Sequence, residues 1–430
     1  MPRGFPFWAI LSSLSGPIRG PRLPPPEPNP RRTAPVFELS ARGMTSRRAA
    51  DLAPSLIRDI ANAGIGRRDV IPLWFGEGCW PSPDIAVEAA RRALADGDHF
   101  YQPNSGKTEL REELSAYHRR IYDVEIDPRR ITVTASGMQA LALVAQALID
   151  PGDRAVIIGP VWPNIRETLR ISGAFVIEHA LRPASGRWSL DVGRLIDDIG
   201  ENTRLVFINS PANPTGWTAT PDELDAVIEH CRRNKVWLVA DDAYSRLCYG
   251  RRYAPCALTR TEPDDLVISV STFSKAWSMT GWRLGWITAP AELEAPLAML
   301  TEYNIAGAPG FVQAAGIAAL RDGEPDVALL QQRLAALRPL AGEHLAGVPG
   351  VRYLEPEGAF YSFFGVDGMT DSVATAKHIL ATCGVGLAPG RAFGPHGEGH
   401  LRLCFAQPPE TLTTALERLA DYFDATAAGG

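Results

Sequence analysis

Short apolar runs alternate with amphipathic segments through the middle of the chain. The apolar runs are rich in Val and Ile and have strand length, whereas the segments between them place apolar residues at helical spacing. We expect strands at Ile131–Thr134, Ala155–Gly159, Ala174–His179, Arg204–Asn209, Val236–Ala240 and Leu266–Val270. This alternation predicts an α/β fold, a mostly parallel sheet flanked by helices, in which ligands bind beyond the carboxyl ends of the strands.

The pattern changes on either side of this region. Before it, helical spacing predicts one helix over Ser46–Ala63. After about Thr288, helices dominate as far as Ala346, and short strands then mix with helices, which predicts a smaller α+β domain. We therefore expect a tail (1–45), an N-terminal segment associated with the small domain (46–75), a large domain (76–305) and a small C-terminal domain (306–430).

Composition narrows the class of protein. The chain has 430 residues, of which 45% are hydrophobic and 21% charged, as in ordinary globular proteins, and its net charge of −6 argues against nucleic-acid binding. No uninterrupted apolar run is long enough to cross a bilayer. The six cysteines form no C-x-x-C pair and no metal spacing with His, so we expect no metal site and a reducing, cytoplasmic location.

The first 48 residues differ from the rest in charge. They contain eight Arg against two Glu, and the stretch Pro24–Pro30 favours an extended, solvated chain. Three explanations stay open: a flexible extension, a targeting segment, or translation that begins at Met44, with residues 1–43 assigned in error. We expect that residues 1–40 can be deleted without loss of activity.

Lys275 has unusual neighbours for a lysine. It follows the last of the predicted strands and is flanked by Phe273, Trp277 and Trp282, whereas most lysines are solvated surface residues. Aromatic neighbours remove water from an ammonium group, which lowers its pKa and frees a nucleophilic amine. Arg283, eight residues on, carries a guanidinium that suits a phosphate. Together they suggest a Schiff-base lysine with a phosphate clamp.

Other polar groups follow the predicted strands. Ser136, Gly137 and Met138 open a helix whose free N–H groups could hold an anion, although Ser-Gly is also an ordinary N-cap. Trp162 could stack on a flat heterocycle or be buried in the core. The amide of Asn213 could bind a ligand oxygen or belong only to a tight turn.

Asp241 ends an apolar strand, where a carboxylate is costly unless it is paired. A protonated ring nitrogen would be such a partner and would make the ring an electron sink. The alternative is a helix N-cap, which fits Asp242 at least as well.

Taken together, four motifs resemble the fold type I aminotransferases of class I/II, the aspartate aminotransferase-like enzymes that use pyridoxal 5′-phosphate (PLP). They are Asn213-Pro-Thr-Gly216, Asp241-x-x-Tyr244, Ser274-Lys275 and Met279-Thr-Gly-Trp-Arg283. The resemblance extends from about Pro72 to the C-terminus. It implies a large PLP-binding domain, a smaller α+β domain, and reversible transfer of an amino group from an L-amino acid to a 2-oxo acid.

The resemblance also implies a role for each matching residue. Lys275 would form the internal aldimine and then act as the general base and acid of the 1,3-prototropic shift, before hydrolysis leaves pyridoxamine phosphate. Asp241 would keep the pyridinium nitrogen protonated. The remaining cofactor contacts would be Tyr244 and Asn213 at the ring's 3-oxygen, Trp162 on its face, and Ser136, Gly137, Met138, Thr272 and Arg283 at the phosphate.

Substrate and partner contacts follow from the same resemblance. Arg402 would grip the substrate α-carboxylate, helped by Asn213 and by backbone near Gly76. Tyr101 would reach the phosphate of the neighbouring subunit's cofactor, which implies a homodimer with shared active sites.

Some residues depart from the family pattern and bear on the substrate. The segment Gly76-Glu-Gly-Cys-Trp80 replaces the usual Gly-Glu-Pro-Asp-Phe, and Phe75, Cys79 and Trp80 suggest an apolar or aromatic entrance. Lys107 could attract a side-chain carboxylate or could simply face solvent at a helix start. The alternatives to transamination are a PLP-dependent lyase or another specialised PLP enzyme on this fold, and a binding module without turnover.

Overall fold

The computed structural model describes residues 45–428, and the chain divides after Ala50 into two units. In the first unit the described part contains one short helix, α2 (Arg47–Ala50). The expectations about residues 1–43 and about deletion of residues 1–40 lie outside the described residues.

The prediction of one helix over Ser46–Ala63 is wrong. The structure has two helices there, α2 and α3 (Leu56–Gly64). Pro54 precludes a continuous helix because it lacks an N–H and disfavours helical geometry in the residue before it. Ser55 then begins the second helix, since its side chain accepts a hydrogen bond from the backbone N–H of Arg58 at 3.3 Å.

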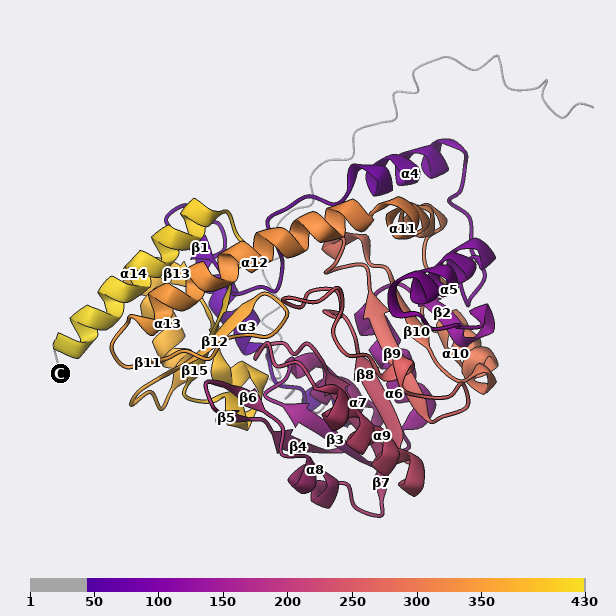
Figure 1. Cartoon of the computed structure of the whole chain (residues 1–430), viewed down its shortest axis with the longest axis horizontal. Helices are drawn as coiled ribbons and strands as arrows, with labels where there is room; N and C mark the ends of the chain where they lie inside the picture. The colour runs from indigo at the N-terminus through magenta and orange to yellow at the C-terminus, as the bar shows by residue number, and fades with distance from the viewer. Residues whose placement is uncertain (1–44, 429–430) are drawn as a thin grey trace, which may run out of the picture. The chain divides into compact units, whose positions relative to one another are not determined.

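The central sheet has seven strands in the order β2-β10-β9-β8-β7-β3-β4, and only β10 runs antiparallel to its neighbours. This confirms the predicted α/β fold with a mostly parallel sheet (Figure 1). The strands are β2 (Ile131–Thr134), β3 (Arg154–Gly159), β4 (Phe175–Ala180), β7 (Thr203–Asn209), β8 (Trp237–Asp241), β9 (Val267–Thr272) and β10 (Gly285–Thr288).

Both faces of the sheet are buried. Alternate residues of β3 and β7 point to opposite sides, so Val156 and Val206 pack into one core while Ile157 and Phe207 pack into another. Helices cover both sides, as a parallel sheet requires. Those of this region are α4 (Asp84–Ala95), α5 (Thr108–Tyr122), α6 (Gly137–Leu148), α7 (Pro163–Ser172), α8 (Val192–Asp198), α9 (Pro221–Asn234), α10 (Glu294–Glu302) and α11 (Gly310–Asp322).

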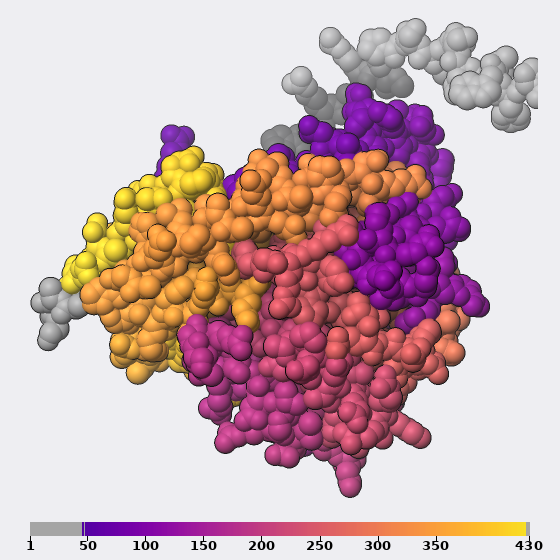
Figure 2. All heavy atoms as spheres, viewed as in Figure 1, coloured from indigo at the N-terminus to yellow at the C-terminus, as the bar shows by residue number. Residues whose placement is uncertain are grey.

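A second sheet follows later in the chain. It has four antiparallel strands in the order β11-β12-β15-β14, and β1 pairs with β13 in a separate two-stranded parallel sheet. Figure 2 shows the long helix α12 as an orange ridge on one face of the molecule. The elements are β1 (Ile71–Pro72), α12 (Glu324–Ala346), β11 (Val351–Arg352), β12 (Tyr361–Val366), α13 (Ser372–Cys383), β13 (Val385–Gly386), β14 (Ala388–Pro389), β15 (His400–Cys404) and α14 (Pro409–Ala428).

The pairing of β1 with β13 joins the N-terminal segment to the C-terminal region. The boundaries proposed at residues 46, 76 and 306 stay a prediction, because residues 51–430 form one compact unit. A small hairpin, β5 (Arg182–Ala184) with β6 (Arg187–Ser189), was not expected from the sequence pattern.

Strand register brings the candidate site together. Asn209 pairs with Asp241, Asp241 pairs with Val270, and Gly285 pairs with both Thr134 and Thr272. The carboxyl ends of the parallel strands therefore meet at one edge of the sheet. Asp241 is the last residue of β8 rather than the first beyond it.

Candidate active site

A cavity of about 400 Å³ lies at this edge of the sheet. Most of the residues expected from the sequence line it, although they come from segments far apart in the chain. They are Gly76, Gly137, Met138, Trp162, Asn213, Asp241, Tyr244, Thr272, Lys275, Arg283 and Arg402. Ser136 immediately precedes Gly137, whereas Tyr101 is 91% exposed and does not line the cavity.

Lys275 points its amine into the cavity. Its Nζ donates to the carbonyl oxygen of Gly76 at 2.6 Å and lies 5.7 Å from the ring centroid of Tyr244 and 5.9 Å from that of Phe360. Burial lowers the pKa of this amine from 10.5 to about 8, and the nearby Arg402 acts in the same direction. The amine is therefore partly neutral near neutral pH. The aromatic rings near its Nζ are those of Tyr244 and Phe360, whereas Phe273 and Trp277, which flank Lys275 in sequence, pack into a hydrophobic core.

Gly76 must be a glycine because the backbone passes very close to Tyr361. A Cβ at this position would lie 2.0 Å from the Tyr361 hydroxyl. The close approach places the Gly76 carbonyl where it accepts from Lys275.

Asp241 is a buried carboxylate at the bottom of the cavity. Its Oδ1 accepts from the backbone N–H of Ala243 at 3.1 Å, and burial raises the pKa of the carboxyl to about 6 while Lys275 opposes the shift. The N-cap interpretation is wrong, because no helix begins directly after β8. Asp242 instead accepts from Ser269 Oγ at 2.5 Å, and burial raises its pKa to about 7.

Arg402 is a buried cation without a carboxylate partner among residues 45–428. Its side chain is 2% exposed; Nη1 donates to Asn213 Oδ1 at 2.8 Å, Nη2 donates to the carbonyl of Trp74, and Nε has no partner. The guanidinium also lies over the ring of Tyr361, 4.5 Å from its centroid. A buried charge without a partner is energetically costly, so this guanidinium is suited to bind an anion from outside the chain.

Two phenols connect the two sheets beside these charges. The hydroxyls of Tyr244, after β8, and Tyr361, at the start of β12, are 2.7 Å apart, and burial raises the pKa of both. Tyr361 was not predicted as a site residue. It ends the segment Gly358-Ala-Phe-Tyr361, and this local pattern does not show that its hydroxyl meets Tyr244.

The opposite end of the cavity suits an anion. Gly137 and Met138 are the first residues of α6, and the side chain of Ser136 accepts from the backbone N–H of Gln139 at 3.1 Å as its N-cap. Free N–H groups and the helix dipole favour negative charge there. Arg283 is exposed at the cavity, with Nη1 donating to the carbonyl of Thr280 at 2.6 Å.

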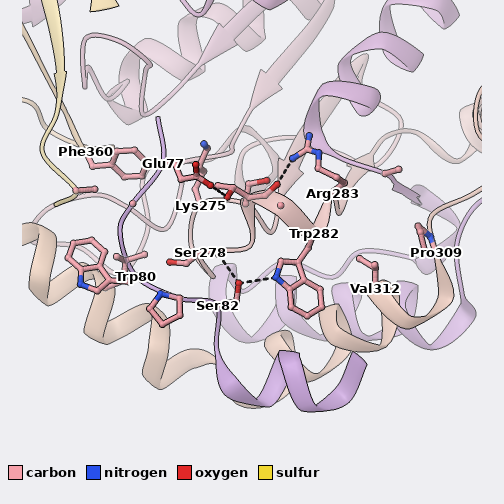
Figure 3. Close-up of a pocket in the computed structure, with 18 of the residues that line it drawn as sticks. Glu77, Trp80, Ser82, Lys275, Ser278, Trp282, Arg283, Pro309, Val312 and Phe360 are labelled. Carbon is pink, nitrogen blue, oxygen red and sulfur yellow. Dashed lines mark hydrogen bonds between the residues drawn. The ribbon is translucent and has the colours of Figure 1, made fainter. Parts of the chain in front are cut away.

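A larger cavity of about 780 Å³ shares Ser274, Lys275, Thr280 and Arg283 with the first. Figure 3 shows Lys275 and Arg283 beside aromatic residues of this larger cavity. Ser82 holds one wall in place, since its Oγ donates to the carbonyl of Ser278 at 2.9 Å and accepts from Trp282 Nε1 at 2.9 Å. The aromatic residues in this lining are Trp80, Trp282, Phe311 and Phe360. This agrees with an apolar entrance at Trp80.

Two further residues of the site region need comment. Lys107 forms an ion pair with Asp98, so it is neither a solvent-facing lysine nor a cation left free for a substrate. Arg58 of α3 lines the smaller cavity and was missed, because a single exposed arginine in a helix gives no local signal.

The family assignment rests on the match between this chain and known proteins. The sequence profile of the family described as aminotransferase class I and II matches residues 69–419. The chain belongs to the class I and II aminotransferases. The aminotransferase is 31% identical over 369 residues to an aspartate aminotransferase of Pyrococcus horikoshii, covering 85% of this chain and 93% of that protein.

Other comparisons with this aminotransferase agree in sequence and in structure. An aspartate/prephenate aminotransferase of Thermus thermophilus is 33% identical over 355 residues, which are 82% of this chain and 90% of that protein. The structure of Thermus thermophilus aspartate aminotransferase with maleate gives a TM-score of 0.82 at 32% identity, covering 88% of this chain and 99% of that one. The aminotransferase therefore depends on PLP and transfers an amino group reversibly between an L-amino acid and a 2-oxo acid.

The cavity of the aminotransferase fits PLP. Asp241 is a buried acid that lacks a cationic hydrogen-bond partner in the described chain, which suits a protonated ring nitrogen. Lys275 supplies a partly neutral amine, and the start of α6 with Arg283 suits a phosphate.

No group of three or more His, Cys, Asp or Glu that could hold a metal ion occurs within residues 45–428, and none of the helices there is long and apolar enough for a bilayer span.

Proposed function

We propose that the smaller cavity is the transamination site and that its residues act in the roles the family resemblance implies. The observation that carries the proposal is a pair of buried charges in the cavity of Lys275: within residues 45–428 Arg402 has no carboxylate partner, and Asp241 has no cationic hydrogen-bond partner. Burying such groups is costly unless a ligand completes them. A cofactor with a basic ring nitrogen and a substrate with a carboxylate would do so.

In this proposal the chain holds the cofactor by its ring and by its phosphate. Bound PLP supplies an electron-withdrawing ring that stabilises negative charge on the substrate Cα. Asp241 would keep the proton on the ring nitrogen, Tyr244 and Asn213 would bind the 3-oxygen, and Trp162 would stack on the ring. The phosphate would be held by Ser136, Gly137, Met138, Thr272 and Arg283.

Lys275 moves the proton in the proposed reaction. Its Nζ, with a pKa of about 8, would accept the proton from the substrate Cα as a general base and would then donate it as a general acid. Arg402 and the backbone near Gly76 orient the substrate through its α-carboxylate, so that the Cα–H bond faces the lysine. Since relatives are named for aspartate, L-aspartate is the first donor to test.

The test combines a donor screen with one variant. Purified enzyme should convert 2-oxoglutarate to glutamate in the presence of a suitable L-amino acid, and Lys275→Ala should abolish both turnover and the absorbance of bound PLP. Pyruvate and ammonia released without an acceptor acid would instead favour a lyase. An enzyme that binds PLP but turns over no donor would contradict the proposal in favour of a binding module.

We also propose a homodimer with shared active sites. Phe100, Tyr101, Tyr303 and Ile305 are exposed apolar residues, with 91% exposure at Tyr101 and 87% at Tyr303. Their loops lie side by side, because Asn104 Nδ2 donates to Glu302 Oε2 at 3.0 Å. Exposed aromatic clusters are typical of protein interfaces.

Subunit mixing tests the dimer. Tyr101→Ala and Lys275→Ala variants should each be weakly active or inactive, but mixed dimers should regain activity, since one of their two sites has both wild-type residues. Failure to regain activity under conditions that exchange subunits, or a monomer by sedimentation, would refute the shared site.

We propose a cytoplasmic location as well. All six cysteines are free, which suits a reducing compartment. Fractionation of cells that express the full chain should place its activity in the cytoplasmic fraction.

A further inference from the structure

Arg58 is a cation of the active-site cavity whose charge is unmatched. It lines the smaller cavity together with Lys275 and Arg402. Its guanidinium lies over the ring of Phe75, 5.2 Å from the centroid. Within residues 45–428 its side chain makes no hydrogen bond or ion pair; only its backbone N–H is bonded, to Ser55 Oγ.

The local structure fixes where Arg58 points. The neighbouring residues Ile57 and Ile60 are buried in the core, while Arg58 lies on the exposed side of α3. Phe75, on which the guanidinium rests, directly precedes Gly76, whose carbonyl accepts from Lys275 at 2.6 Å. Arg58 is therefore one aromatic ring away from the backbone that contacts the reactive amine.

The other cations of this cavity already have roles in the proposed function. Arg402 binds the α-carboxylate, Lys275 moves the proton and Arg283 binds the phosphate. Arg58 is the remaining cation of the cavity, and it is available to bind the side chain of the substrate. Among substrate side-chain groups, a carboxylate suits a guanidinium best, because it can accept two parallel hydrogen bonds from it.

We propose that Arg58 determines specificity by binding the side-chain carboxylate of dicarboxylic amino acids and 2-oxo acids. This inference rests on the proposed role of Arg402 in the same cavity. The aromatic lining of the larger cavity favours a different substrate class, with apolar side chains, but neither Arg402 nor Arg58 lines that cavity. Arg58 and Arg402 line the same cavity, so a substrate whose α-carboxylate is bound by Arg402 shares that cavity with Arg58.

The test compares L-glutamate with L-glutamine, which has the same length without the charge. Arg58→Gln in the PLP-loaded enzyme should lower kcat/KM for glutamate about tenfold and change that for glutamine less than about twofold. Arg58→Lys should restore part of the loss. The matched control is Arg333→Gln, because Arg333 also lies over an aromatic ring, 5.4 Å from the centroid of Trp80, but does not line the smaller cavity.

A binding measurement separates this inference from the proposed function. Arg58→Gln should raise the Kd of the inert dicarboxylate glutarate about tenfold and leave that of butyrate unchanged, by calorimetry on the PLP-loaded enzyme. This result does not require turnover, so it stands even if no donor reacts.

Equal losses with glutamate and glutamine, or equal effects on glutarate and butyrate, would overturn the role of Arg58. A wild-type preference for L-phenylalanine over glutamate that Arg58→Gln leaves unchanged would also overturn it and would assign the side chain to the larger cavity.

Discussion

The pKa of Lys275 can be tested directly through the pH dependence of cofactor uptake. Burial lowers this pKa from 10.5 to about 8, a cost of about 3 kcal/mol for the charged form. At pH 7.5 about a quarter of the amine is then neutral, against about 0.1% for an ordinary lysine. Only the neutral amine attacks the aldehyde of PLP, so uptake should rise about tenfold per pH unit below 8 and level off above it.

The measurement is the rate at which apoenzyme takes up PLP, followed by absorbance from pH 6 to 10. Nα-acetyl-lysine is measured in parallel, and the ratio of the two rates cancels the ionisation of PLP itself. Lys275→Ala gives the blank. A ratio that stays constant across the whole range would refute the reasoning, because it would mean that Lys275 titrates like a solvated lysine.

Three further predictions follow from particular contacts. Gly76→Ala should lower kcat/KM at least about tenfold, since the added Cβ would lie 2.0 Å from the Tyr361 hydroxyl. Gly78→Ala is the control and should change kcat/KM little, because the nearest atom to its added Cβ would lie at 3.4 Å; similar values for the two variants would contradict this prediction. Arg402→Lys should lower kcat/KM for amino acids on the order of a hundredfold, and an unchanged value would exclude α-carboxylate binding by Arg402. His118 is buried, neither of its ring nitrogens has a hydrogen-bond partner within residues 45–428, and burial lowers its pKa from 6.5 to about 4. As the pH drops, the unfolded chain therefore binds a proton before the folded chain does, and the free energy of unfolding falls between about pH 6.5 and about pH 4. His118→Phe should reduce the loss of unfolding free energy between pH 7 and pH 4.5 by about 2.5 kcal/mol in denaturant titrations, and an unchanged loss would contradict this.

The sequence predicts the sheet well because each strand is a local pattern. The run Ile131–Thr134 matches β2, and Thr108–Tyr122 matches α5. Asp241 and Lys275 could be found in the same way, since a polar residue at the end of an apolar strand is a local feature. Pro54 was the signal that should have divided the N-terminal helix.

Contacts between distant segments could not be predicted from local pattern. The hydroxyls of Tyr244 and Tyr361 meet across 117 residues of sequence, and Arg402 reaches the carbonyl of Trp74 across 328. No local sequence pattern indicates which residue each of these will contact, because each hydrogen bond depends on how distant segments of the chain come together. Arg58 was missed for the same reason.

The paired phenols of Tyr244 and Tyr361 have a consequence for the evolution and the engineering of this enzyme. Tyr244 follows β8 of the central sheet, and Tyr361 begins a strand that pairs with the strand of Arg402. A substitution that retunes either side for a new substrate disturbs a group on the other side, so the two halves of the gene are not independent building blocks. Exchange of the C-terminal region between relatives should succeed mainly where both tyrosines are inherited together.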